Sequence, residues 1–237
     1  MTDLATPLVD AVRAALAAVP PEEGAGVVVT VGGQEVTARA ATTPRPVGAD
    51  VVGLLVVAAV DGLIAQGLLS PGTTVGECVP ASSLPAGVEA TDTVQDLVDR
   101  LGAGPPERRA AVVEVLGRVL NASSGLTVVE AVRREVTDPL AMRDTGPASQ
   151  VELFAADVAA DPGVERWETT PADLVRITGT SQWGALVQTG AVSRHGPAGR
   201  TGAAGVWTYD GAPVAVACVG GGGAVLAALD QLFAPTG

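Results

Sequence analysis

The sequence predicts an α/β fold of the α+β kind, with one antiparallel sheet flanked by N- and C-terminal helices and an all-helical subdomain. Two observations support this prediction. Segments typical of β-hairpins occur near both ends of the chain, at residues 24–41 and 198–221, and helical patterns dominate the sequence between them. The terminal segments should therefore share one sheet-containing layer, with the helices as an insertion. We expect a single domain over residues 1–237, with a sheet subdomain from 1–46 and 165–237 and a helical subdomain from 47–164.

The N-terminal segment predicts a helix followed by a hairpin. "MTDLATPLVDAVRAALAAVPPEE" lacks the basic start of a signal peptide and carries Asp3 and Asp10 among apolar positions, so it reads as an amphipathic helix. Two β-branched segments, 24–33 and 34–41, then meet at a Gly-Gly pair, which is typical of a hairpin.

Four helices are predicted next. Residues 50–66 are almost continuously apolar, which indicates a buried central helix rather than a surface one. Residues 91–103 begin with a Thr/Asp cap and stop at glycine and two prolines. The other two predicted helices are residues 106–125 and a segment that starts at residue 126 and ends at Asp138-Pro139.

The C-terminal third predicts a loop, a short helix, a hairpin and a last helix. Residues 149–168 are poorly patterned, so we expect a loop with at most a short strand. "TTPADLVRI" has threonines before Pro171, which suits a capped helix with proline in its first turn. A hairpin around "DGAP" and the helix "GAVLAALDQLF" end the chain.

The composition excludes several function classes. The formal net charge of −12 repels nucleic acid and anionic membrane surfaces, so we expect neither as a partner. No apolar run reaches the ~20 residues that span a bilayer, and we expect a cytoplasmic, acidic protein. Cys78 and Cys218 lie far apart without metal-ligand spacing, so we expect a buried, reduced Cys218, no metal and no cofactor.

Four segments, in this order, resemble the serine β-lactamase and penicillin-binding-protein superfamily, in particular its class C β-lactamase, DD-peptidase and esterase branch. "GLIAQGLLSPGTTVGECVP" is similar to the family's "LVERGKLDLDDPVSKYLP" type of segment, and "PLAM-RDTG" to its "PLGMxdTg". "TTPADLVRI" resembles "STAxDLAxF", and "GRTGAAGVWTYDGAPVAVACV" resembles the K-T-G strand and its partner. Together they span most of the chain, and the resemblance implies a β-lactamase-like fold.

The resemblance also implies where the catalytic residues should stand. The family's S-x-x-K motif opens the central helix, where the lysine amine activates the serine hydroxyl one turn away. Counted from Gly67, the serine position falls on Asp50 and the lysine position on Gly53, and the chain contains no lysine at all. The Y-x-N element falls on Arg108 to Ala110, so its tyrosine and asparagine are missing. The segment that leads into it is shortened, so we expect a trimmed member of the fold.

Four residues remain as candidate ligand-binding positions. Arg200, Thr201 and Gly202 stand where the family has K-T-G, and an arginine fork beside a hydroxyl suits a carboxylate. The structural alternative is that Gly202 only allows close backbone packing. His195 lies in a Gly/Pro-rich segment where a solvated histidine is the usual case. For Asp50 we expect a helix N-cap rather than a nucleophile.

These observations predict a hydrolase homologue that lacks its catalytic elements, a pseudoenzyme. One alternative is a module that binds a small anion at the remnant Arg-Thr-Gly cleft. A second is a residual esterase or amidase that uses His195 with an acid such as Asp50. A third is an interaction protein with a protein partner, or a homo-oligomer, whose tryptophans or trimmed cleft make the contact.

Overall fold

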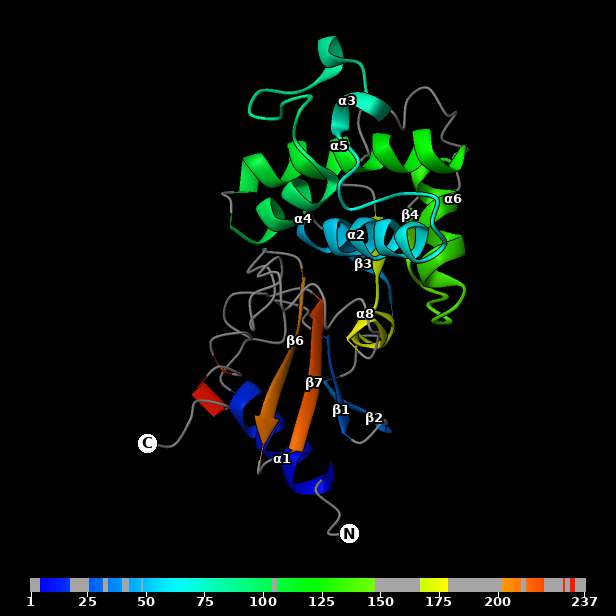
Figure 1. Ribbon diagram of the computed structural model, residues 1–237. Helices are drawn as coiled ribbons and strands as arrows, with labels where there is room; N and C mark the ends of the chain where they lie inside the picture. Colours follow the sequence, from blue (N-terminus) through cyan, green and yellow to red (C-terminus); the bar gives the residue numbers. More distant parts are fainter. Residues whose placement is uncertain are drawn as a thin grey trace.

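A four-stranded antiparallel sheet joins the two ends of the chain (Figure 1). The computed structural model describes residues 5–17, 26–31, 34–39, 43–47, 49–103, 106–147, 167–178, 202–209, 212–219, 228 and 231–232. The strand order is β2-β1-β7-β6. The strands are β1 (Gly26–Val31), β2 (Gln34–Arg39), β6 (Gly202–Tyr209) and β7 (Ala212–Val219). Both predicted hairpins are confirmed, and β1 pairs with β7 from Gly26↔Val219 to Val31↔Val214.

The two faces of this sheet contact different layers. Helix α1 (Ala5–Leu16) covers one face, because its buried positions recur with helical spacing and meet alternate residues of β1 and β7. This smaller core consists of Leu8, Val12, Leu16, Val27, Val29, Val214, Val216 and Cys218. Cys218 is buried and unbridged, as predicted. Ala228 and Leu232, from the predicted last helix, pack on the same core, and residues 228, 231 and 232 are helical.

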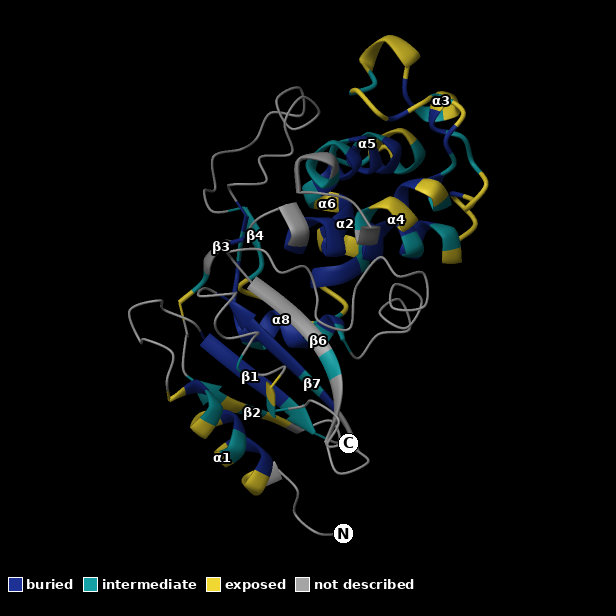
Figure 2. Ribbon diagram, turned by 90° about the vertical axis from the view of Figure 1, so that its left-hand side faces the viewer, coloured by how far each residue is buried: buried dark blue, intermediate teal, exposed yellow. Residues whose placement is uncertain are grey.

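The other face belongs to the main core, which continues into the helical layer. Its centre is α2 (Ala49–Ala65), in which every residue from 51 to 60 is buried. Figure 2 shows α2 as largely buried beneath the surrounding helices. Around it lie α4 (Val94–Ala103), α5 (Pro106–Ser124) and α6 (Val128–Val132). The predicted central helix is therefore confirmed to within one residue at each end.

Three helices begin with the threonine caps that the sequence contains. The hydroxyl of Thr93 accepts from the Asp96 backbone N–H before α4, and Thr127 forms a full capping box with Glu130 before α6. Thr170 caps α8 (Pro171–Ile177), with proline in the first turn as predicted. Each cap satisfies a helix N–H that has no partner inside the helix.

Several short elements depart from the sequence-based expectation. A second sheet, of order β3-β5-β4, is formed by strands β3 (Arg45–Val47), β4 (Gly146–Pro147) and β5 (Trp167–Thr169). α6 does not run regularly to residue 138 but continues as a π-helix, η3 (Arg133–Thr137). Two short helices, α3 (Val75–Cys78) and η2 (Ala81–Ser83), lie before α4. The subdomain boundary predicted at 164/165 lies outside the described residues, and the division stays a prediction.

Among the described residues, no single helix is both long and apolar enough to cross a membrane. Only the pair of segments Arg109–Ser124 and Val128–Thr137, bent by 79° at their junction, reaches that length and composition together.

Ala141, in the "PLAM" segment, has a left-handed backbone with φ of 53°. This conformation costs a residue with a Cβ ~1 kcal/mol or more relative to glycine, partly offset by the greater freedom of glycine in the unfolded chain. We therefore expect Ala141→Gly to stabilise the protein by about 0.5 kcal/mol, measured as a higher urea midpoint at unchanged slope. The matched control is Gly125→Ala, because Gly125 has φ of 69° and open space around its Cβ position. By the same balance it should lose about 0.5 kcal/mol, and stabilisation by both variants would contradict the argument.

Candidate functional site

The first turn of α2 lies at Asp50 and Gly53, the two positions that the resemblance predicts for serine and lysine. The helix begins at Ala49, so Asp50 lies inside the first turn and not at the N-cap where we predicted it. The helix starts one residue before Asp50 and its N-cap position two residues before, so the prediction was wrong by two residues. The side chain of Asp50 lies outside the described part of the structure, and no contact is assigned to it.

Gly53 is buried where α2 crosses α4 and α5. A Cβ built on Gly53 would lie 3.0 Å from Cγ2 of Val113 and 3.8 Å from Cδ2 of Leu101. Val113 is fully buried, so it has little space into which to move. Any side chain at Gly53 would therefore meet this helix–helix contact at its first atom.

The Y-x-N positions lie at the start of α5. Because α5 begins at Pro106, Arg108 and Ala110 lie in its first turns rather than in a loop. Ala110 is half-buried, and the side chain of Arg108 lies outside the described residues. The segment predicted to correspond to Y-x-N is therefore regular helix.

The Arg-Thr-Gly element leads into β6. Gly202 is the first residue of that strand and pairs with Val219 of β7, which belongs to the same core as α2. Figure 1 shows that β6 starts at the end of the sheet nearest α2. Arg200, Thr201 and His195 lie outside the described residues, so their side chains are not placed. Within the described ranges, no three His, Cys, Asp or Glu side chains are grouped in a way that could hold a metal ion.

A buried polar network joins two of the segments that carry the family resemblance. The carboxylate of Asp173 in α8 accepts from the backbone N–H of Asp144 at 2.7 Å and from the hydroxyl of Thr145 at 3.0 Å. The hydroxyls of Thr145 and Thr169 are 2.6 Å apart. Burial raises the pKa of Asp173, although the donors from Asp144 and Thr145 oppose the shift. Sequence reasoning predicted only the helix cap here and missed the carboxylate that fastens "RDTG" to α8.

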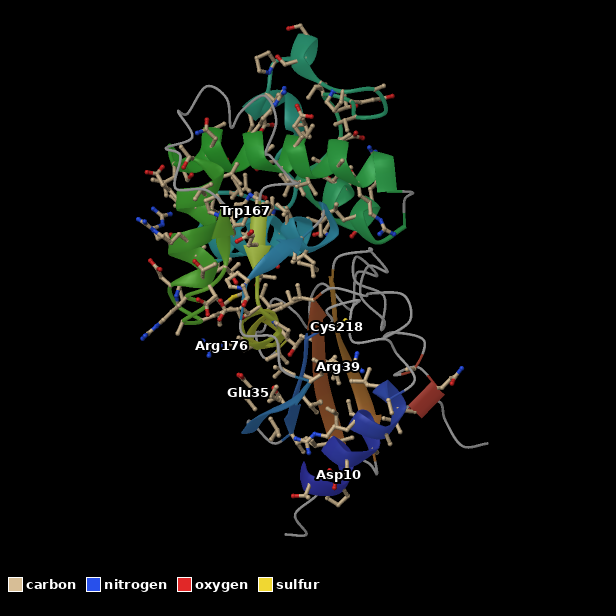
Figure 3. All side chains as sticks on the ribbon, turned by 180° about the vertical axis from the view of Figure 1, so that it is seen from behind. Asp10, Glu35, Arg39, Trp167, Arg176 and Cys218 are labelled. Carbon is tan, nitrogen blue, oxygen red and sulfur yellow. The ribbon has the colours of Figure 1, made fainter. Side chains whose placement is uncertain are left out.

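Arg176 strengthens the same connection from the surface side. Its guanidinium donates to the carbonyls of Leu140 and Ala141 and lies 3.9 Å from the Glu35 carboxylate on β2. Figure 3 shows Arg176 and Glu35 on neighbouring elements at the outer side of the sheet. These contacts connect α8 to the backbone of residues 140–141 and to β2, so we assign Arg176 a role in stabilising the fold.

Asp61 is the one acid in α2 outside its first turn, and burial raises its pKa to about 6. Its charge is therefore unfavourable in the folded protein at neutral pH. A lone acid in an apolar helix was a visible signal in the sequence, but none of the predictions used it.

Asp61→Asn is expected to stabilise the protein at pH 7.5 by about 1 kcal/mol, a value discounted for the partial exposure of this half-buried side chain. The folded pKa lies above the unfolded one, so ionisation destabilises the native state above pH 6, and the penalty fades as pH falls from about 6 to about 4. The gain of the variant should therefore be large at pH 7.5 and small at pH 4.5, measured by urea unfolding at both. Asp10→Asn, at an exposed position of α1, is the control, and equal gains at both pH values would contradict the assignment.

Comparison with known proteins supports the fold alone. No family model matches the sequence, and no curated protein matches it. Among solved structures, a D-stereospecific amidohydrolase from Streptomyces sp. is similar over 96% of this chain and 99% of its own, with TM-score 0.61 and 15% identity. A class C β-lactamase from Rhodobacter sphaeroides is similar over 94% and 98%, with TM-score 0.60 and 14% identity. A penicillin-binding protein from Bacillus halodurans is similar over 94% and 99%, with TM-score 0.57 and 14% identity. These proteins belong to the serine β-lactamase and penicillin-binding-protein superfamily, and the chain has their mixed α/β fold.

Proposed function

We propose that this chain is a non-catalytic member of the serine β-lactamase and penicillin-binding-protein superfamily, a pseudoenzyme that keeps the scaffold without the acylation machinery. The fold likeness and the ordered motifs support the superfamily. The contact between Gly53 and Val113 carries the rest of the proposal, since it occupies the space that the activating lysine would need.

The chemistry follows from what acylation requires. A hydroxyl nucleophile needs an adjacent base, because a free serine is a weak nucleophile at neutral pH. The helix start offers Asp50 and Gly53 in place of serine and lysine, and the chain has no lysine elsewhere to recruit. The Y-x-N positions carry no tyrosine hydroxyl either. Acylation by the family's route therefore has neither nucleophile nor base.

Intact-mass spectrometry after incubation with benzylpenicillin, and separately with a fluorophosphonate probe, tests the proposal. We expect the unmodified mass in both cases, and a class C β-lactamase treated in parallel should gain the adduct. A stoichiometric adduct on this chain would overturn the pseudoenzyme assignment. Loss of that adduct in His195→Ala or Asp50→Ala would then support the residual esterase or amidase instead.

A second candidate function is the binding of a small carboxylate by Arg200 and Thr201. It is supported by the position of Gly202 at the first residue of β6, at the end of the sheet that faces α2. Thermal-shift titration with small carboxylates should stabilise the parent chain more than Arg200→Ala. Equal responses from the two proteins would remove this candidate.

A further inference from the structure

A pocket of about 160 Å³ lies between the α6–η3 segment and the small sheet of β4 and β5, and Thr145 of the Asp173 network lines part of it. Its apolar lining includes Val129, Val132, Met142 and Trp167, and Arg133 and Arg143 also line it. Figure 3 shows Trp167 on β5, beside α6. The pocket belongs to neither the start of α2 nor the start of β6.

The floor of the pocket is fixed by packing. Val132, Met142 and Trp167 are at most 3% exposed and belong to the main core. A pocket of this volume with an apolar floor accommodates one benzene-sized group, since an engineered cavity of ~150 Å³ binds benzene. The pocket therefore suits a single ring or a branched alkyl group rather than a large ligand.

Two arginines and one aspartate, Asp138, also line the pocket, so the charges on its lining sum to a net positive value. Arg143 forms no ion pair with any residue that the structure describes. Arg133 lies 3.9 Å from Asp138, but these side chains are 69% and 70% exposed, so solvent weakens the attraction. In a chain of net charge −12, such cations beside an apolar floor favour an anionic group on the ligand.

The π-helix η3 explains why Arg133 faces this pocket. The backbone N–H groups of Asp138 and Met142 bond five residues back, to Arg133 and Thr137. The widened turns bring Glu135 against Gly62 of α2, where the Gln66 amide donates to its carboxylate at 2.5 Å. With Glu135 held on the α2 side, Arg133 and Thr137 line the pocket. Single π-turns occur often at functional sites, and this one holds the pocket wall in place.

We propose that the pocket between α6–η3 and β4–β5 binds a small aromatic or branched-alkyl carboxylate, with its apolar part on Trp167 and Met142 and its carboxylate at Arg143 and Arg133. This site goes beyond the proposed pseudoenzyme function. None of the residues that line it belongs to α2 or β6.

Calorimetric titration of the intact chain with benzoate tests the proposal, with benzyl alcohol as the uncharged probe of similar size. We expect a saturable signal with a dissociation constant on the order of 1 mM, as suits a ligand of so few atoms. Benzyl alcohol should bind at least fivefold more weakly, and so should benzoate to Arg143→Gln. Val129→Phe, which fills the pocket, should abolish binding. Arg13→Gln, on the exposed side of α1, should leave the affinity unchanged.

Each outcome decides for or against the site. No saturable binding of benzoate, or equal affinity for benzoate and benzyl alcohol, would overturn the proposal. Benzoate affinity that falls in Arg200→Ala and not in Arg143→Gln would place the anion site at β6 and overturn this one. Arg143→Gln is expected to unfold at the same temperature as the parent chain without ligand, so a loss of binding there reports on the pocket.

Discussion

Gly53→Lys is expected to destabilise the protein by about 3 kcal/mol or more and to restore no acylation. Overpacking a buried site costs ~1–3 kcal/mol, and an ammonium among buried apolar side chains adds a desolvation cost unless it loses its proton. The first atom of the new side chain would already lie 3.0 Å from Val113. Urea unfolding at pH 7.5 measures the loss.

Matched variants isolate the contact. Ala65→Lys places the same side chain at an exposed position near the end of α2, where stability should change by less than about 0.5 kcal/mol. Gly53→Ala should gain less than the ~1 kcal/mol that alanine brings to an open helix position, and the full gain should appear in the Val113→Ala background. A Gly53→Lys protein as stable as the parent would show that the lysine position is open.

The sequence predicted the long, strongly patterned elements because their signals are local. The β-branched segments around Gly-Gly and "DGAP" predicted both hairpins, and the Thr170-Pro171 pair predicted the start of α8. β3 and β4 were missed, since strands of two or three residues are too short to show a periodicity, whereas β5 overlaps the end of residues 149–168, where the sequence allowed a short strand. The π-helix at the end of α6 was missed because it depends on a tertiary contact. The side chain of Glu135 packs against Gly62 of α2, and no local pattern shows this.

The candidate site shows the same division between local and tertiary signals. Spacing alone was enough to place Asp50 and Gly53 in or beside the first turn of α2. That Val113 lies against Gly53 depends on how α5 crosses α2, and these two residues are about sixty positions apart in sequence. From the sequence, Asp173 was an acid in the first turn of a capped helix. Its hydrogen bonds to Asp144 and Thr145 join residues 29 and 28 positions apart, so no local pattern predicts them.

Loss of the Asp173 carboxylate is the second large effect that we expect. Asp173→Ala should cost about 2 kcal/mol, because it removes the acceptor of the partly buried Asp144 N–H and Thr145 hydroxyl, of which only the hydroxyl keeps a second partner, Thr169. Asp173→Asn should cost about half as much, since an amide oxygen still accepts one bond and avoids the charge burial that raises the pKa of Asp173. Asp10→Ala, on the exposed face of α1, is the control and should change stability by less than about 0.5 kcal/mol.

The residues that lose amide protection in Asp173→Ala distinguish a local effect on the loop from a general weakening of the core. Asp173 and Arg176 both hold the "PLAM-RDTG" loop, the first through Asp144 and Thr145 and the second through the Ala141 carbonyl. Amide hydrogen exchange in Asp173→Ala should therefore rise first in residues 140–147, while α2 and α5 keep their protection until global unfolding. A uniform rise over all helices, or unchanged exchange in the loop, would show that Asp173 does not fasten it. We expect the intact mass of Asp173→Ala after incubation with benzylpenicillin to stay unmodified, as for the parent chain, although amide exchange in the loop has risen.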